Sequence, residues 1–265
     1  MSHIYLKGNS FRQIKLFQIK SNVLLQKSFL KVLKKLNIHN LIEIGASNAE
    51  ISQIFTKSDK NIAWAIEANP YTYNEKTKRH KSKNLHTFNF AIGNQSGETE
   101  IYIPFNTEEK QNLTPGNASL LKPLFERNFL KVKIEIETLD QFIKDERILK
   151  SIGLWVDVEG ASINVIVGGK KELNKELIEV IFIEVEHRNF WEMGTSFNNL
   201  DSTLKELDFC VLAKDYEYLN QNNVIYIKRN KRYKVLSIKL YYEMLIFFNF
   251  LRSFRIQKVV KTFLL

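Results

Sequence analysis

Acidic side chains stand at the ends of three short apolar runs in this sequence, where they could do chemistry. They are Glu67 after 62–66, Asp157 and Glu159 at the end of 154–158, and Glu184 and Glu186, followed by His187, at the end of 180–185. A carboxylate can accept hydrogen bonds from the vicinal hydroxyls of a ribose, and a carboxylate or imidazole can take a proton from a reacting group. The pattern predicts that these groups bind a nucleoside and move a proton.

A glycine turn follows the run 41–44. Gly45 permits a tight strand-to-helix turn, and Ser47 with Glu50 has the spacing of a capping box. A helix that begins here would point free backbone N–H groups at the crevice, where an anionic group could bind. The alternative is an ordinary strand-turn-helix corner without a ligand.

Glu67 stands 22 residues beyond Gly45. This is close to the distance at which a doubly wound fold places the acid that binds ribose hydroxyls. Alternatively, Glu67 is a solvated acid before a helix that Asn69 caps, with Pro70 at its first position. The spacing favours ribose binding.

The turn does not indicate a dinucleotide cofactor. A dinucleotide fingerprint needs G-x-G-x-x-G, and here Ser47 and Glu50 take the second and third glycine places. S-adenosylmethionine has no pyrophosphate. Its methionine end carries a carboxylate and an ammonium, which the N–H groups of the turn and the acid Glu43 could match. S-adenosylmethionine therefore suits this turn better than a dinucleotide does.

Asp157 is the first candidate for a base or a substrate-orienting group, because it stands beside the expected cofactor. Glu159 and His187 are further catalytic candidates. Glu159 could instead cap the helix after Gly160, and His187 could be a surface or packing residue. The acids could also hold a divalent ion, but no spaced ligand set requires one, so the sequence predicts no metal ligand.

The apolar runs alternate with segments of helix length. The runs are 41–44, 62–66, 85–90, 154–158 and 180–185, and the helical segments are 50–56, 71–81, 162–171 and 198–207. Nearly continuous apolar runs are typical of strands buried on both faces, and alternation with helices indicates an α/β fold with a parallel sheet. Ligands of such sheets bind beyond the carboxyl ends of the strands, where the acids stand.

Composition divides the chain into a helical lead (1–38), a central domain (39–229) and a basic, aromatic-rich helical tail (230–265). Within the domain, alternating polar and apolar residues in 97–139 predict antiparallel strands around a loop, an insertion next to the site. Its neutral polar side chains and nearby aromatic side chains could cover a bound substrate such as a sugar, which would accept the transferred group. They are Tyr102, Asn112, Asn117, Ser119, Trp155, Phe190, Trp191 and Phe197.

Five ordered motifs resemble the FkbM family of S-adenosylmethionine-dependent methyltransferases over about residues 41–227. They are Glu43-Ile44-Gly45-Ala46-Ser47-Asn48-Ala49, Glu67-Ala68-Asn69-Pro70, Phe90-Ala91-Ile92-Gly93-Asn94, Thr138-Leu139-Asp140 and Val156-Asp157-Val158-Glu159-Gly160-Ala161. Ile183-Glu184-Val185-Glu186 follows in the next run. The chain departs from the family pattern at Ala49, where the family has a glycine, at Ser47, where it has asparagine, and at Ser162, where an acid is usual.

The resemblance implies a Rossmann-like class I methyltransferase fold with a mostly parallel seven-stranded sheet. It also implies an O-methyltransferase that acts on a hydroxyl of a sugar, glycan precursor or small metabolite. We expect the cofactor to lie against Glu43, Gly45, Ala46, Ser47, Glu67, Ala68, Asn89, Ala91 and Asp157.

The net charge of +10 is concentrated at the two ends of the chain. Residues 1–40 hold eight basic and no acidic residues, residues 228–265 hold ten basic and one acidic, and the middle holds 21 basic and 28 acidic. The basic ends make a nucleic-acid methyltransferase an alternative, although the acidic middle would repel phosphates. A non-catalytic module used for assembly is a third possibility, supported by Ala49 and Ser47.

A single cysteine, Cys210, and the lack of a signal-peptide pattern or a long apolar stretch favour a cytoplasmic protein. The tail mixes aromatic residues with Lys and Arg. We expect it either to contact the inner face of an anionic membrane or to pack on the domain or on a second subunit as a homo-oligomer.

Overall fold

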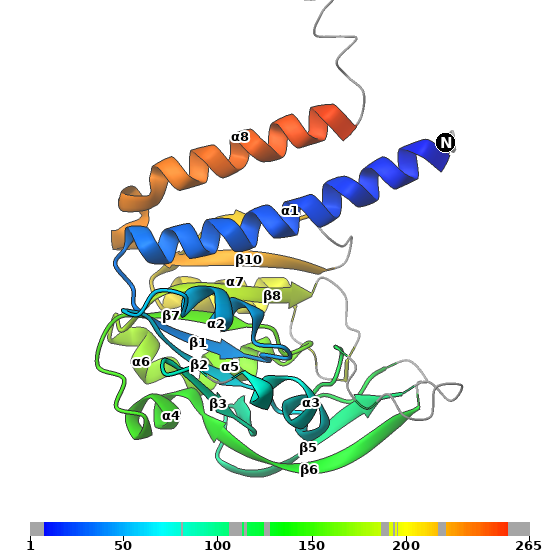
Figure 1. Cartoon of the computed structure of the whole chain (residues 1–265), viewed down its shortest axis with the longest axis vertical. Helices are drawn as coiled ribbons and strands as arrows, with labels where there is room; N and C mark the ends of the chain where they lie inside the picture. Colours follow the sequence, from blue (N-terminus) through cyan, green and yellow to red (C-terminus); the bar gives the residue numbers. More distant parts are fainter. Residues whose placement is uncertain are drawn as a thin grey trace, which may run out of the picture.

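The computed structural model describes residues 8–80, 82–105, 113, 116–124, 128–186, 191–192, 194, 196–216 and 221–253. A seven-stranded sheet runs through its centre in the order β3-β2-β1-β7-β8-β10-β9 (Figure 1). Its strands are β1 (Asn40–Ile44), β2 (Ile62–Ile66), β3 (Leu85–Phe88), β7 (Ile152–Val156), β8 (Ile178–Glu186), β9 (Phe209–Lys214) and β10 (Gln221–Lys228). Neighbours from β3 to β8 pair in parallel, and β10 runs antiparallel to β8 and β9. The mostly parallel seven-stranded sheet is confirmed.

The direction in which the sheet grows reverses at β1. The chain adds β2 and β3 on one side of β1, and then β7 and β8 on the other. Parallel sheets of this kind bind ligands at that reversal, beyond the carboxyl ends of the strands.

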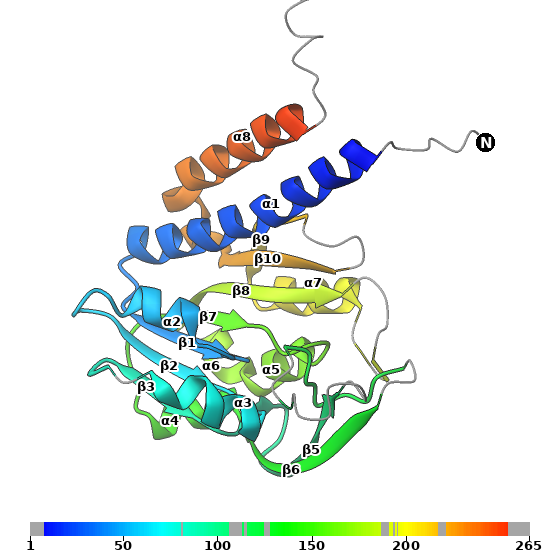
Figure 2. The ribbon, with the colours of Figure 1, turned by 45° about the vertical axis from the view of Figure 1, so that its right-hand side comes forward.

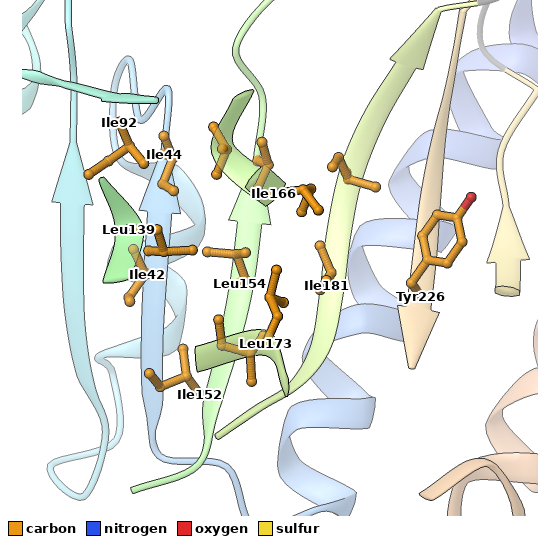
Figure 3. Packing of buried hydrophobic residues seen from close by; sticks show 14 of the residues in the cluster. Ile42, Ile44, Ile92, Leu139, Ile152, Leu154, Ile166, Leu173, Ile181 and Tyr226 are labelled. Atoms are coloured by element: carbon orange, nitrogen blue, oxygen red, sulfur yellow. The ribbon is translucent and has the colours of Figure 1, made fainter. Parts of the chain in front are cut away.

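Helices cover both faces of the sheet. One face packs against α4 (Leu139–Asp145), α5 (Ser162–Gly168), α6 (Lys170–Asn174) and α7 (Phe197–Glu206). Figure 3 shows Ile44, Leu154 and Ile181 of neighbouring strands on this face together with Ile166 and Leu173 of the helices. The strands have few polar residues because they are buried on both sides; every residue of β1 and β7 is buried.

The short helices near the reversal are α2 (Glu50–Phe55), α3 (Pro70–Glu75) and the 3₁₀ turn η1 (Thr77–Arg79). The predicted helix 71–81 is therefore too long, and the predicted helix 162–171 is divided at Gly169 into α5 and α6. Adjacent glycines weaken a helix. Gly168 also packs closely, since a Cβ there would lie 1.9 Å from the Gly93 carbonyl oxygen.

The insertion forms a second sheet of β4 (Ala91–Gly93), β5 (Gly97–Pro104) and β6 (Phe129–Thr138). β5 and β6 pair antiparallel, as the alternating pattern predicts. β4 pairs in parallel with β6, which the sequence did not reveal because β4 is only three residues long. Backbone hydrogen bonds between Tyr102 and Ser119, at 2.8 and 3.0 Å, tie the loop to β5.

The lead and the tail form helices that lie side by side (Figures 1 and 2). α1 (Gly8–Lys35) packs on the second face of the sheet, where the Phe29 ring meets the rings of Trp155 and Phe182 at 5.7 Å. The 3₁₀ segment η2 (Arg229–Val235) leads into α8 (Leu236–Ser253), whose Tyr242 hydroxyl donates to the Lys214 carbonyl at 2.7 Å. Within the described residues, no helix is both long enough and apolar enough to cross a membrane.

Candidate active site

A pocket opens at the carboxyl ends of β1, β2 and β7, at the reversal of the sheet. Three acidic side chains line it, Glu67, Asp157 and Glu159. Apolar side chains such as Ile66, Phe90 and Ile92 form part of its wall, and residues 116 and 118–120 of the insertion close one side. The topology therefore brings together acids that lie about 90 residues apart in the sequence.

The backbone fixes Glu67 at the end of β2. One carboxylate oxygen accepts the Ser47 N–H at 2.7 Å, and the other accepts the Asn69 N–H at 2.8 Å. Burial raises the pKa of Glu67 above its usual value, against the effect of these hydrogen bonds. Each carboxylate oxygen has two lone pairs, so Glu67 can accept further hydrogen bonds from a ligand in the pocket.

Two asparagines support this part of the pocket. Asn69 caps α3, as predicted, by accepting the Tyr71 N–H at 3.0 Å, and its amide donates to the Leu113 carbonyl of the insertion at 3.0 Å. Asn89 donates to the Glu67 carbonyl at 2.8 Å. Asn89, a predicted cofactor residue, thus holds the end of β2 in place, whereas the predicted residues Ala68 and Ala91 line the pocket.

Thr72 is a pocket residue that sequence reasoning missed. It lies in the first turn of α3 and lines the pocket beside Glu67. Its hydroxyl oxygen is buried and has no hydrogen-bond partner among the described residues. A buried hydroxyl without a partner costs free energy, so it indicates a site where a ligand polar group can bind. The only signal in the sequence was its place after the Asn69-Pro70 cap.

Glu43 does not contribute to the pocket, in contradiction to the prediction that it matches a cofactor ammonium. Its carboxylate accepts the N–H of Ser52 at 2.9 Å and also the Ser52 hydroxyl. A backbone hydrogen bond from Ile51 adds to these. Burial raises the pKa of Glu43 from 4.5 to about 7. Glu43 therefore stabilises the start of α2 from inside the fold.

The turn after β1 does not present free N–H groups in the way the sequence predicted. The N–H groups of Gly45 and Ala46 both donate to the Ile66 carbonyl, at 2.9 and 3.0 Å, and that of Ser47 donates to Glu67. The predicted capping box is also wrong. Ala49, with φ of 51°, is the residue before α2, and no side chain caps the helix from that position. The anion near this helix start is the carboxylate of Glu43.

Gly45 is required by a close approach between two strands. Its φ is 78°, and a Cβ at this position would lie 1.8 Å from the backbone oxygen of Asp157. Because the Asp157 N–H donates to the Ile44 carbonyl at 3.0 Å, the chain after β7 runs directly beside the turn after β1. Asp157 and Gly45 therefore reach the pocket together.

Asp157 has the electrostatics of a group that exchanges protons near neutral pH. Burial raises its pKa from 3.8 to about 6. Glu159 follows with a φ of 47°, and Gly160 has a φ of 81°. The Ser119 hydroxyl of the insertion donates to the Glu159 carbonyl at 2.6 Å, which holds this strained turn against the pocket.

Glu184, from the end of β8, lies next to this turn. One carboxylate oxygen from each of Asp157, Glu159 and Glu184 lies within 4.8 Å of the others. Burial, and then the charges of Asp157 and Glu159, raise the pKa of Glu184 well above its usual value. The predicted catalytic residue His187 lies outside the described residues, as do Asn112 and Phe190.

The aromatic residues proposed for an acceptor do not all face the pocket. Trp155 stacks on Phe182 with ring centroids 3.6 Å apart, in the core beneath α1, so its assignment to the acceptor side is wrong. Trp191 packs against Gly160, and its indole N–H donates to Glu186 at 2.9 Å. Successive side chains of a strand point to opposite faces of the sheet, so Trp155 lies on the other face from its two neighbours in β7.

The Thr138-Leu139-Asp140 motif is structural. The Thr138 hydroxyl accepts the Gln141 N–H at 3.2 Å and caps α4. The two oxygens of Asp140 accept the N–H groups of Lys171 and Glu172, at 3.1 and 2.9 Å, at the start of α6. The motif therefore joins two helices behind the sheet.

Comparison with known proteins identifies similar sequences and folds. The profile described as "Methyltransferase FkbM domain" matches residues 43–211. No curated protein sequence matches the chain. Among solved structures, EvdMO1 is 7% identical with a TM-score of 0.42, and the match covers 77% of this chain and 40% of EvdMO1, so the chain spans less than half of that protein.

Two solved methyltransferases also match. Magnesium protoporphyrin IX methyltransferase from Synechocystis PCC 6803, solved with bound S-adenosylmethionine, is 8% identical with a TM-score of 0.42, over 78% of this chain and 80% of that one. A SAM-dependent methyltransferase from Aquifex aeolicus is 11% identical with a TM-score of 0.37, over 72% of this chain and 82% of that one.

Proposed function

The chain belongs to the FkbM methyltransferase family, and we propose that it methylates a hydroxyl group of a sugar, a glycan precursor or a small metabolite. The protein is a methyltransferase whose cofactor is S-adenosylmethionine, and its fold is the Rossmann-like class I methyltransferase fold. The acceptor and the site residues are our proposal. The observation that carries it is that Glu67 and Asp157 line one pocket at the reversal of the sheet.

The pocket fits S-adenosylmethionine. A carboxylate fixed by two N–H groups suits the two ribose hydroxyls, and the unpartnered Thr72 hydroxyl lies beside it. The apolar side chains of Ile66 and Ile92 suit a flat base. We assign the ribose to Glu67, and we no longer assign the methionine end to the N–H groups of the turn, because these donate within the fold.

When bound, S-adenosylmethionine supplies an electrophilic methyl group on its sulfonium. The chain must then hold an acceptor hydroxyl in line and receive its proton. Asp157 is partly buried in the pocket wall, and desolvation raises its pKa to about 6. A base whose pKa lies near the working pH contributes roughly 10² to 10⁴ in rate, and alignment contributes much of the remainder.

The acceptor side is formed by the insertion. Ser119 and the small residues Gly116 and Ala118 line the pocket opposite the strand ends. Small and neutral polar groups leave room for an acceptor that forms hydrogen bonds without carrying charge, which supports a sugar over a phosphate-rich nucleic acid. In addition, the negatively charged carboxylates of Asp157 and Glu159 would repel phosphates.

A screen of methyl transfer tests this proposal. Purified protein is incubated with S-adenosylmethionine and with free sugars, nucleotide sugars, small hydroxylated metabolites or RNA, and the product mass is read directly. We expect a product heavier by one methylene from a sugar or small metabolite and not from RNA. Methylated RNA, with none of the small acceptors modified, would favour the nucleic-acid alternative.

We also propose that the basic helix α1 and the aromatic-rich helix α8 contact an anionic membrane surface. Part of α8 is buried on the domain through Tyr242, but other apolar side chains remain exposed on both helices; they include Leu16, Ile19, Leu240, Phe247 and Phe248. The exposed lysines Lys15 and Lys20 of α1 accompany them, and each basic residue near an anionic surface adds about 1 kcal/mol.

Flotation with anionic and neutral vesicles tests the membrane contact. Wild-type protein should float with anionic vesicles only, and Phe247→Ser together with Phe248→Ser should reduce the bound fraction. A protein that stays unbound but changes oligomer size with the same double substitution would show that this face joins two copies of the chain.

A further inference from the structure

We propose that Asp157, Glu159 and Glu184 form a binding site for a divalent cation at the carboxyl ends of β7 and β8. The proposal deepens, and rests on, the methyl-transfer function of the same pocket. Its starting point is that three carboxylates from two neighbouring strands converge at one place, next to where the acceptor would bind.

The distances suit a shared ion. The three ligand oxygens all lie within 4.8 Å of one another. Oxygens that bind Ca²⁺ at about 2.3 to 2.6 Å can be separated by up to about 5 Å, and those that bind Mg²⁺ at about 2.1 Å by up to about 4 Å. The spacing of the three oxygens therefore falls within the range for Ca²⁺, and Mg²⁺ requires them to lie within about 4 Å of one another. The all-oxygen ligand set favours Mg²⁺, Mn²⁺ or Ca²⁺.

Glu184 supplies an independent indication of a ligand. Its side chain is 8% exposed, and Gln221 hydrogen-bonds its carboxylate. One oxygen of this carboxylate, Oε1, is nevertheless buried without a hydrogen-bond partner within the described part of the chain. Such an atom costs free energy unless something binds it. Since the Glu184 carboxylate lies beside those of Asp157 and Glu159, a cation is the partner that their charges favour.

Basic side chains do not neutralise these carboxylates in the described residues. In the portion of the chain that the structure describes, no lysine or arginine forms an ion pair with Asp157 or Glu184. The backbone also holds the ligands in place. The turn at Glu159 is strained, and the Ser119 hydroxyl fixes its carbonyl.

The ion would act on the acceptor. Three protein ligands leave about three of the six positions of Mg²⁺ or Mn²⁺ open, enough for two neighbouring oxygens of one acceptor and a water. A bound cation lowers the pKa of a coordinated hydroxyl and orients it. As that oxygen formed its bond to the methyl carbon, the bond from that carbon to the sulfonium sulfur would break and leave S-adenosylhomocysteine, and the hydroxyl proton would pass to the Asp157 oxygen that does not hold the ion. This favours acceptors with two adjacent oxygens, such as a vicinal diol.

Metal binding can be measured without catalysis. Full-length protein is freed of metal with a chelator and titrated with Mn²⁺, and the free ion is followed by its electron paramagnetic resonance signal. The variants are Glu184→Gln and, as matched control, Glu179→Gln. Glu179 lies near the opposite end of β8, is also 8% exposed and pairs with Lys231. Folding is checked by circular dichroism, and Asp157→Asn provides a second ligand variant.

We expect one Mn²⁺ per chain, displaced by Mg²⁺ or Ca²⁺, with affinity at least tenfold weaker in Glu184→Gln or Asp157→Asn and unchanged in Glu179→Gln. Absence of binding at millimolar Mn²⁺, or equal weakening in the control variant, would overturn the proposal. Full methyl transfer in excess chelator would also overturn it while leaving the proposed function intact. Failure of S-adenosylmethionine itself to bind would instead count against the proposed site.

Discussion

Replacing Glu67 by alanine should weaken cofactor binding without unfolding the protein. In the structure, the two oxygens of this carboxylate already accept the N–H groups of Ser47 and Asn69, which aims the remaining lone pairs into the pocket. The substitution removes both acceptors for the ribose hydroxyls and leaves the two N–H groups to water.

The size of the effect follows from the burial of Glu67, which is 8% exposed. A hydrogen bond to a charged group contributes about 1.5 to 3 kcal/mol, but the two bonds share one carboxylate and water replaces part of each. We therefore expect a loss of about 2 to 3 kcal/mol, equivalent to about a 30- to 150-fold weaker dissociation constant. Glu67→Gln keeps one acceptor oxygen, so its affinity for the cofactor should lie between that of the wild type and that of Glu67→Ala.

Isothermal titration with S-adenosylmethionine measures these affinities. Glu75→Ala is the control, because Glu75 is an exposed glutamate eight residues further on and does not line the pocket. Its affinity should match the wild type. If folded Glu67→Ala binds the cofactor within about twofold of the wild type, the carboxylate does not hold the ribose and our placement of the cofactor is wrong.

Three further predictions concern residues in and near the pocket. Asp157→Asn should lower kcat by about 10²-fold or more with a smaller change in cofactor affinity, and an unchanged kcat from pH 6 to 9 would exclude it as the base. The buried Glu43, with a folded pKa of about 7 against 4.5, is disfavoured when ionised, so it should reduce stability increasingly as pH rises between these values. We expect the free energy of unfolding by denaturant to fall between pH 5 and pH 8 by up to about 3 kcal/mol more in the wild type than in Glu43→Gln. An identical pH dependence in the two proteins would contradict this prediction. Gly45→Ala should cost more than about 2 kcal/mol of unfolding free energy because its Cβ would collide with the Asp157 carbonyl, and a wild-type melting curve would contradict that.

The sequence predicted the sheet well because its strands are buried on both faces. The run 62–66 became β2 with the same limits, and 180–185 fell within β8. The Asn69-Pro70 cap was also predictable, since it depends on a side chain and its immediate neighbours. The predicted limits of 85–90 and 154–158 were less accurate. The length over which a segment forms a strand depends on how far the neighbouring strand extends beside it, which the segment's own sequence does not reveal.

Long-range contacts account for what the sequence could not reveal. The use of Glu43 at the start of α2 depends on how β1 packs against that helix, and a capping-box pattern at Ser47 and Glu50 gave a local answer that this contact overrides. The unpartnered hydroxyl of Thr72 and the approach of Glu184 to Asp157 likewise exist only once the strands are side by side. Acids at strand ends were visible in the sequence, but their distances were not.

A crystal structure of the protein with S-adenosylhomocysteine would test the central claim most directly. We expect the ribose hydroxyls within hydrogen-bond distance of Glu67, the base against Ile66 and Ile92, and the sulfur facing Asp157 and the insertion. A ligand bound elsewhere, or one in this pocket with its ribose turned away from Glu67, would contradict the account.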